Sequence, residues 1–278
     1  MMASRALCGS FALMCVAALA VGSAALAQQP AAGYEPKVGQ EGKDVVWVPT
    51  PQTLVDRMLD MAKATPQDYV IDLGSGDGRT VITAAKRGIK AHGVEYNPEM
   101  VALAKGNAKS EGVAHRATFV EGDIFETDFS QATVLTLFLL TDLNIKLRPT
   151  ILKMKPGTRV VSNTFMMGDW EPDDRVEAPP GCSSFCKASL WIVPAQVEGT
   201  WQMGQSELVL EQKYQAISGR LKTGNVIAPI TNGKMSGDRI AFSAGGTQYT
   251  GTVAGNAIDG ASKGDGGEAK WQATRAAK

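Results

Sequence analysis

Histidine and cysteine are scarce in this sequence of 278 residues, which has two histidines and four cysteines. A protein zinc site takes three or four ligands from His, Cys and carboxylate side chains, usually at short and regular spacings. His92 and His115 lie far from the cysteines and from each other. We therefore expect no metal site, and we interpret both histidines as structural or surface residues.

The sequence has no excess of charge of one sign either, because 28 lysines and arginines face 28 aspartates and glutamates. Proteins that bind nucleic acid concentrate lysine and arginine to neutralise phosphates. The balanced charge offers no such signal, so we expect no nucleic-acid partner. A protein or a small molecule is the expected partner instead.

After residue 27, no apolar run approaches the roughly 20 residues that a membrane-spanning helix needs. The first residues differ: Arg5 precedes an unbroken apolar run at 11–21, and Ala-Leu-Ala at 25–27 resembles a cleavage site before Gln28. These features predict a signal peptide, cleavage after Ala27 and an exported, periplasmic chain without a stable membrane span. The alternative is a membrane anchor formed by residues 6–26.

Cysteine usage agrees with export. Cys8 and Cys15 leave with the signal peptide, and the mature chain keeps Cys182 and Cys186. An even pair in an oxidising compartment favours a disulfide, and a separation of four residues can be bridged within a loop. Two free thiols are the alternative.

A glycine-rich turn lies at the centre of the first half of the chain, in the run DYVIDLGSGDG at 68–78. Residues 69–71 are apolar and largely β-branched, as in a strand buried on both faces, and 79–86 has the apolar spacing of a helix. Glycines at 74, 76 and 78 let the backbone turn tightly and let a ligand approach it. The unit predicts a nucleotide-type crevice.

The glycine spacing distinguishes two ligand classes. The dinucleotide fingerprint G-x-G-x-x-G would need glycine at position 79, which is Arg79, whereas the third glycine here is Gly78. The pattern D-x-G-x-G-x-G resembles motif I of class I methyltransferases, which bind S-adenosylmethionine (SAM). SAM has no phosphate, so the turn need only approach its methionine part, and Asp72 suits the amino end.

Two further acids follow the next strands. Glu95 ends the predicted strand 91–96, where a carboxylate can accept both ribose hydroxyls, and this residue alone would also fit NAD. Asp123 follows the strand 117–121, where the resembled family has an acid for the adenine amino group. Three acids at three successive strand ends predict SAM as the cofactor. The expected site comprises Asp72, Gly74, Ser75, Gly76, Gly78, Glu95, Tyr96, Asn97, Asp123, Ile124 and Thr50.

Strands and helices alternate over this part of the chain, which predicts a parallel sheet with right-handed crossovers. Thr50 precedes Pro51 and an apolar stripe, so it is interpreted as a helix cap or, alternatively, as a SAM contact. The further elements are predicted at 98–112 (helix), 132–140 (strand), 142–154 (helix), 158–163 (strand) and 188–193 (strand). The expected fold is α/β, with a doubly wound, mostly parallel sheet of the seven-stranded type.

Over residues 47 to 194, the chain resembles one particular family of class I methyltransferases. The chain resembles the class I lysine methyltransferases that act on small membrane proteins of mitochondria, and bacterial relatives of those enzymes. Five runs carry this resemblance: DLGSGDGR, GVEYNP, TLFLLTDLNIKLRP, KPGTRVVSNTF and GDW. The resemblance implies methyl transfer to a protein lysine. This chain departs from the family in its export signal, its lack of an N/D-P-P-Y element and its extra C-terminal region. A small-molecule methyltransferase, or an exported SAM-binding scaffold without turnover, is the alternative.

Methyl transfer from a sulfonium is an in-line displacement, so the protein chiefly has to align the nucleophile and exclude water. Polar residues at the active edge of the sheet are the catalytic candidates, namely Asp142, Asn144 and Asn163, with Thr164 and Phe165 beside them. Trp170 is expected to line the substrate channel.

After residue 197 the pattern changes to short alternating runs, with turn residues about every 8 to 12 positions. This pattern predicts a small antiparallel barrel or sandwich of about seven or eight strands, which either binds a ligand or partner or stabilises the catalytic domain. The expected domains are a signal peptide (1–27), a flexible arm (28–46), a methyltransferase domain (47–196) and a small β domain (197–278).

Overall fold

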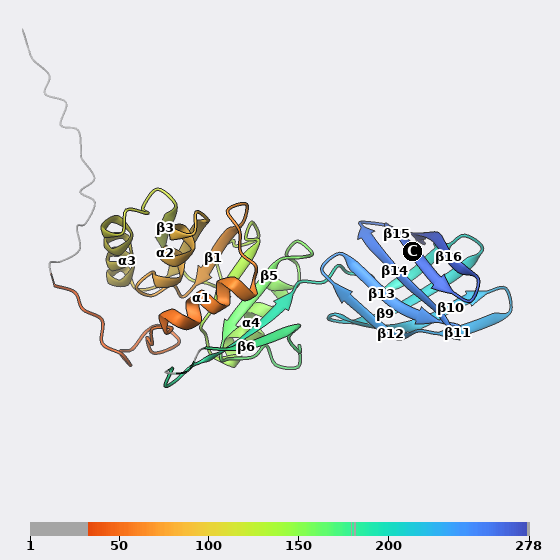
Figure 1. The fold of residues 1–278 in the computed structure, drawn as a ribbon. Helices are drawn as coiled ribbons and strands as arrows, with labels where there is room; N and C mark the ends of the chain where they lie inside the picture. Colours follow the sequence, from red (N-terminus) through yellow and green to blue (C-terminus); the bar gives the residue numbers. More distant parts are fainter. Residues whose placement is uncertain (1–32, 179, 181, 277–278) are drawn as a thin grey trace, which may run out of the picture.

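The computed structural model describes residues 33–178, 180 and 182–276, so the expected signal peptide lies outside the described residues. One sheet has the strand order β3-β2-β1-β4-β5-β7-β6 (Figure 1). Strands β1 to β5 are parallel, while β7 runs antiparallel to β5 and to β6. The bounds are β1 Tyr69–Leu73, β2 Lys90–Glu95, β3 Ala117–Glu121, β4 Val134–Leu137, β5 Arg159–Asn163, β6 Asp174–Glu177 and β7 Lys187–Ile192.

Helices cover both faces of this sheet because successive strand residues point to opposite sides. Val70 shares a core with the buried side chains of α1, α2 and α3. Ile71 and Leu73 belong instead to the core that contains Leu147 and Ile151 of α4. The helices are α1 Gln52–Met61, α2 Arg79–Lys86, α3 Pro98–Ser110 and α4 Thr141–Ile151. The predicted doubly wound α/β fold is confirmed.

The C-terminal strands form an antiparallel barrel with its own core. Strand β9 pairs with β10 as well as with β8, which closes the sheet on itself, and β11 and β12 both pair with β10. Buried side chains such as Trp201, Phe242 and Ile258 fill the interior. The bounds are β8 Gly199–Met203, β9 Ser206–Lys213, β10 Ala216–Thr223, β11 Val226–Pro229, β12 Thr231–Ser236, β13 Arg239–Ala244, β14 Thr247–Ala254, β15 Ala257–Gly264 and β16 Gly267–Arg275.

The barrel lies beside the first sheet, and the connection runs from Ile192 at the end of β7 to Gly199 at the start of β8 (Figure 1). This connection coincides with the expected boundary at 196–197. Of the two alternatives for the expected β module, a barrel is observed. In the described parts of the chain, no helix combines the length and apolarity needed to cross a bilayer.

Trp170 lies where the barrel meets the first sheet. Its side chain is fully buried, and its ring stacks on Tyr214 at 5.7 Å between centroids. The indole Nε1 donates to Gln215 Oε1 at 2.8 Å, in the turn between β9 and β10. The expectation that Trp170 lines a substrate channel is therefore wrong, because the residue fills the interface instead.

Charged groups attach the same turn of the barrel to the loop after β5. Asp169 accepts hydrogen bonds from the Tyr214 hydroxyl (2.8 Å) and from Arg148 (2.7 Å), and Lys213 Nζ lies 2.9 Å from its other oxygen. The hydrogen bonds from Lys213 and Tyr214 hold the pKa of Asp169 below its usual range. Arg148 also donates to the Met167 carbonyl at 2.8 Å. The barrel is thus bound to a loop of the catalytic sheet, in addition to the covalent connection.

Replacing Tyr214 tests this attachment. Tyr214→Ala removes the ring that covers Trp170, so we expect the free energy of unfolding to fall by about 2 kcal/mol and the melting temperature to fall by roughly 4–8 °C. Tyr214→Phe keeps the ring and loses only the hydrogen bond to Asp169, so it should cost less than half as much. Scanning calorimetry measures both changes, and an unaltered melting temperature for Tyr214→Ala would show that the contact does not stabilise the protein.

Candidate functional site

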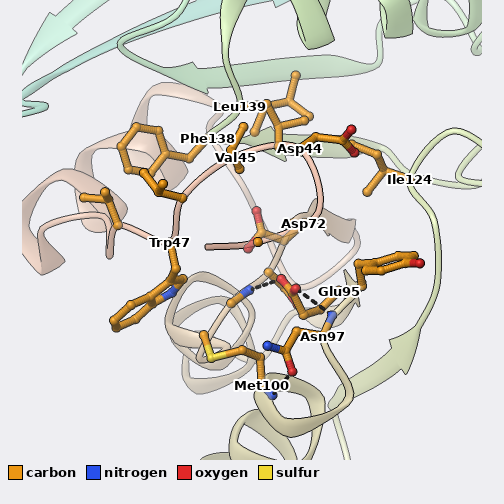
Figure 2. Close-up of a pocket in the computed structure, with 18 of the residues that line it drawn as sticks. Asp44, Val45, Trp47, Asp72, Glu95, Asn97, Met100, Ile124, Phe138 and Leu139 are labelled. Atoms are coloured by element: carbon orange, nitrogen blue, oxygen red, sulfur yellow. Dashed lines mark hydrogen bonds between the residues drawn. The ribbon is translucent and has the colours of Figure 1, made fainter. Parts of the chain in front are cut away.

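A cavity of about 420 Å³ lies at the carboxyl ends of the central strands (Figure 2). Ligands of open α/β sheets bind at this edge. The glycine turn after β1, the ends of β2, β3 and β4, and residues 40–50 from before α1 line the cavity. Of the eleven residues predicted for the cofactor site, all except Gly78 are among those that line it.

The glycine turn needs glycine for its backbone and for its neighbours. Gly74, Gly76 and Gly78 have φ values of 77°, 53° and 83°, which side chains disfavour. A Cβ on Gly76 would lie 2.7 Å from the Trp47 indole nitrogen, and one on Gly78 would lie 2.7 Å from Phe119. Gly78 thus lets α2 pack closely, whereas Gly74 and Gly76 form the cavity wall.

Glu95 holds the turn in place at the end of β2. One carboxylate oxygen accepts from the Gly76 N–H at 2.9 Å, and the other accepts from the Asn97 N–H at 3.0 Å. Asn97 in turn caps α3 by accepting from the Glu99 N–H at 2.9 Å. A carboxylate oxygen has two acceptor positions, so each oxygen of Glu95 can still accept a hydroxyl. A pair of neighbouring ribose hydroxyls suits this arrangement.

Asp72 supplies a buried acid at the end of β1. Its side chain accepts from the Thr136 hydroxyl at 2.6 Å. Burial, aided by the charges of Glu95 and Asp77, raises the pKa of Asp72 to about 7, although the hydrogen bond from Thr136 opposes the shift. A cationic group in the cavity would favour the ionised carboxylate. Asp72 therefore suits the ammonium end of a ligand.

Asp123 lies at the third strand end, where it is bound to the chain segment before α1. One oxygen accepts from the Phe125 N–H at 2.9 Å, and the other is ion-paired with Lys43. The hydrogen bond from Lys43 lowers the pKa of Asp123. The Lys43 ammonium also lies 4.7 Å from the centre of the exposed Tyr96 ring. Lys43 thereby connects the residues before α1 to the far side of the cavity.

Residues 40–47 cover the cavity, a role that the sequence alone does not predict. Backbone hydrogen bonds from Gly39 to Trp47 and from Trp47 to Gln40 close this segment into a loop. Trp47 and Val45 both line the cavity (Figure 2). The sequence predicts a flexible arm at 28–46, and residues 40–46 of this range line the cavity. The apolar run Val-Val-Trp-Val at 45–48 is the signal that points to packing.

The structure also corrects the interpretation of Thr50 as a helix cap. Helix α1 begins at Gln52 with Pro51 at the N-cap, and no side chain caps it. Thr50 Oγ1 instead accepts from Asn163 Nδ2 at 3.3 Å, and Thr50 lines the cavity. The chain turns into the cavity before the helix starts, so the hydroxyl cannot reach the free N–H groups of α1.

None of the predicted catalytic residues Asp142, Asn144 and Asn163 lines the cavity. Asp142 is exposed on α4. Asn144 is fully buried and donates to the Phe165 carbonyl at 3.2 Å, so it holds the loop after β5. Asn163 is also buried and positions Thr50. Their polar groups thus support the walls of the cavity, of which Phe165 is part.

No cluster of three His, Cys, Asp or Glu side chains suited to a metal ion occurs within the described part of the chain. Cys182 and Cys186 form a disulfide, with their Cα atoms 5.9 Å apart. Among residues that the sequence did not single out, Met100, Phe138, Leu139 and Phe185 line the cavity.

Known proteins resemble this chain over its catalytic domain. The family model of the ANTKMT methyltransferase domain matches residues 72–174. A protein-lysine N-methyltransferase of Saccharolobus islandicus is 49% identical over 140 residues, which are 49% of this chain and 87% of that protein. The chain belongs to this methyltransferase family. SAM is therefore its methyl donor.

Two other relatives show how far the similarity extends. A crystal structure described as an RNA methyltransferase from Salinibacter ruber, bound to S-adenosylhomocysteine, is 45% identical with a TM-score of 0.51, and the match covers 54% of this chain and 96% of that one. A lysine N-methyltransferase of Xenopus laevis, named for its action on ATP synthase, is 34% identical over 46% of this chain and 56% of that protein. The chain thus spans about half the length of this animal relative.

The residues of the cavity fit SAM. Asp72 suits its cationic amino acid end, Glu95 its ribose hydroxyls and Asp123 its adenine amino group. Ile124 and Met100 provide apolar surface near the end of β3 and the start of α3. Ser75 belongs to the same lining, and its Oγ is buried without a hydrogen-bond partner among the described residues. When bound, SAM supplies an electrophilic methyl group.

Loss of the Glu95 carboxylate should weaken SAM binding. Glu95→Ala removes the acceptors for the ribose hydroxyls and the support of the Gly76 N–H, so we expect the dissociation constant to rise roughly 10–100-fold. Glu121→Ala is the matched control, because Glu121 ends β3 but is exposed and outside the cavity. Titration calorimetry measures both, and equal affinities for the two variants would remove Glu95 from the site.

SAM affinity should also depend on pH through Asp72. With a pKa of about 7 in the free protein, the carboxylate is ionised above neutral pH and protonated below it. Affinity for the cationic ligand should therefore fall about tenfold between pH 8 and pH 6. Asp72→Asn should bind SAM weakly at both values, with a flatter pH profile. A wild-type profile identical to that of the variant would contradict this role.

The stability of the folded protein gives an independent measure of the pKa of Asp72. A raised pKa in the folded state means that ionising Asp72 costs stability as pH rises from about 4 to 7. Without ligand, Asp72→Asn should therefore gain stability relative to the wild type across this range and keep that gain above pH 7. Urea unfolding at pH 4.5 and pH 8 measures the difference, and a difference that does not change with pH would contradict the raised pKa.

Proposed function

We propose that this protein transfers the methyl group of SAM to the side-chain amine of a lysine in a protein. One observation carries the proposal: the chain is 49% identical to a protein-lysine N-methyltransferase over 87% of that relative. The cavity supports it, because it combines three acids for the cofactor with apolar side chains beyond them.

Methyl transfer to an amine does not require a reactive side chain of the protein. The amine nitrogen forms a bond to the methyl carbon while the bond from that carbon to sulfur breaks, and the electron pair stays on sulfur. A lysine ammonium has a reference pKa near 10.4, so the amine must first lose a proton to water. An apolar cavity lowers that pKa by disfavouring the charged form. Excluding water and aligning the amine are thus the tasks of the cavity walls.

We also propose that the mature chain acts outside the cytoplasm on a protein of the cell envelope. Residues 1–27 have the pattern of a signal peptide, and the Cys182–Cys186 disulfide suits an oxidising compartment. The relative from Xenopus laevis is named for a lysine of ATP synthase, so its acceptor is a protein. Because SAM is made in the cytoplasm, export would require that SAM reach the exported enzyme.

An RNA acceptor is the second candidate, and the Salinibacter ruber structure favours it, because that protein is described as an RNA methyltransferase and is 45% identical. The charge of this chain argues against it. Equal numbers of basic and acidic residues give no excess of positive charge to neutralise phosphates.

Labelled SAM distinguishes the acceptors. The mature chain, residues 28–278, is incubated with methyl-labelled SAM and envelope extract, and the products are treated with ribonuclease or with protease. We expect label that resists ribonuclease, is released by protease and elutes as methyl-lysine after acid hydrolysis. Glu95→Ala is the control, and its signal should be much weaker. Label that ribonuclease releases would indicate RNA, and label in small solutes would indicate a small-molecule acceptor.

A further inference from the structure

Three phenylalanines meet at one end of the cavity. Phe138 follows β4, Phe165 follows β5, and Phe185 lies in the loop between β6 and β7. The ring centres of Phe138 and Phe185 are 5.2 Å apart, and Phe165 lies 6.1 Å from Phe138 and 6.3 Å from Phe185. All three line the cavity and are only partly buried, so each ring presents some of its surface to the interior.

The strand order separates this aromatic cluster from the cofactor acids. Asp72 and Glu95 lie at the ends of β1 and β2, and Asp123 follows β3; these strands occupy one half of the sheet. Phe138 and Phe165 follow β4 and β5 in the other half, beside β7. The cavity therefore has an acidic end and an aromatic end. The assignment of the acidic end to SAM leaves the aromatic end for the second substrate.

We propose that Phe138, Phe165 and Phe185 form the acceptor subsite and select a side chain with an aliphatic stem and a cationic or amine head. The proposal deepens the proposed function and rests on it. Methylene groups gain free energy from burial against the rings. The faces of aromatic rings attract cations within about 6 Å, which favours an ammonium or a methylated ammonium over a neutral group of the same shape.

The disulfide constrains the backbone at Phe185 and so keeps its ring in this cluster. Phe185 directly precedes Cys186 and has a φ of 53°, an unfavourable conformation for a bulky side chain. Such a conformation persists only where the surroundings impose it. Cys182 is bonded to Cys186, and the Cys186 carbonyl accepts from the Ala178 N–H at 2.7 Å. Opening the disulfide would release the constraint, so Phe185 would leave the cluster for part of the time.

Phe165 is held by a different means. Its carbonyl accepts from Asn144 Nδ2 at 3.2 Å, and Asn144 is fully buried in α4. Thr164, just before it, has a φ of 61° and donates to the Asn163 side chain at 2.8 Å. Phe165 therefore does not depend on the disulfide. Of the three rings, only Phe185 is placed by a bond that a thiol reductant can break.

Ligand binding tests the subsite without turnover. The mature chain, saturated with S-adenosylhomocysteine, is titrated with Nα-acetyl-Nε-trimethyl-lysine methylamide and with its neutral isostere, in which carbon replaces the quaternary nitrogen. Ligand-observed NMR should show that the cation binds about fivefold more tightly. Phe185→Ala should abolish most of this preference, while Phe185→Tyr should keep it. Equal binding of the two ligands to the wild type would overturn the proposal.

Kinetics on the envelope acceptor give a second readout. Phe185→Ala should lower kcat/KM at least tenfold and leave the dissociation constant of SAM unchanged within about twofold. The Cys182→Ser/Cys186→Ser variant should show a smaller loss, and a thiol reductant should reproduce that loss in the wild type but not in the double variant. If SAM affinity falls in parallel with kcat/KM, Phe185 belongs to the cofactor site and the inference fails.

The two proposals fail in different ways. If the wild type methylates no lysine in any envelope protein, the proposed function is wrong whatever Phe185 does. If the wild type methylates lysine and Phe185→Ala has the same kcat/KM, the function stands and the acceptor subsite lies elsewhere. Unaltered kinetics in the double cysteine variant, with a loss in Phe185→Ala, would keep the subsite and overturn the role of the disulfide.

Discussion

The hydrogen bonds of the Glu95 carboxylate are the interaction on which the rest of the site depends. By accepting from Gly76 and Asn97, Glu95 joins the glycine turn after β1 to the start of α3. The turn needs glycine at position 76, because Gly76 adopts a positive φ and a Cβ there would meet the Trp47 indole. A single acid thus shapes the wall of the cavity and retains acceptor capacity for a ligand. Binding and local structure are coupled at this residue.

Two segments outside the sheet complete the cavity, and the barrel supports one of its loops. Residues 40–50 cover it and are connected to its far side by the ion pair between Lys43 and Asp123. The disulfide loop contributes Phe185. The barrel contributes no residue to the lining, but it binds the loop that begins at Phe165, through Tyr214 and Trp170. Separate parts of the chain thereby cover the cavity, supply one ring of its aromatic end and hold one of its loops in place.

The fold and most residues of the cavity could be predicted because their signals are local. A buried strand, a turn with three positive-φ glycines and an amphipathic helix occupy one run of residues at 69–86. Strand ends of a parallel sheet meet at one edge, so Glu95 and Asp123 could be placed beside Asp72 without coordinates. The catalytic candidates were less successful. Asn144 follows β4 and Asn163 ends β5, yet both are buried, and they hold the Phe165 carbonyl and the Thr50 hydroxyl instead.

The sequence by itself determined the class of fold, the glycine turn, the acids at the strand ends and the change to short strands after residue 197, because each depends on spacing along the chain. Tertiary structure alone decided that residues 40–47 cover the cavity, that Trp170 fills the interface with the barrel and that three phenylalanines meet. The sequence does not indicate which residues an apolar side chain such as Trp47, Trp170 or Phe185 contacts. Their neighbours are set by how distant segments pack, and that packing is a property of the whole molecule.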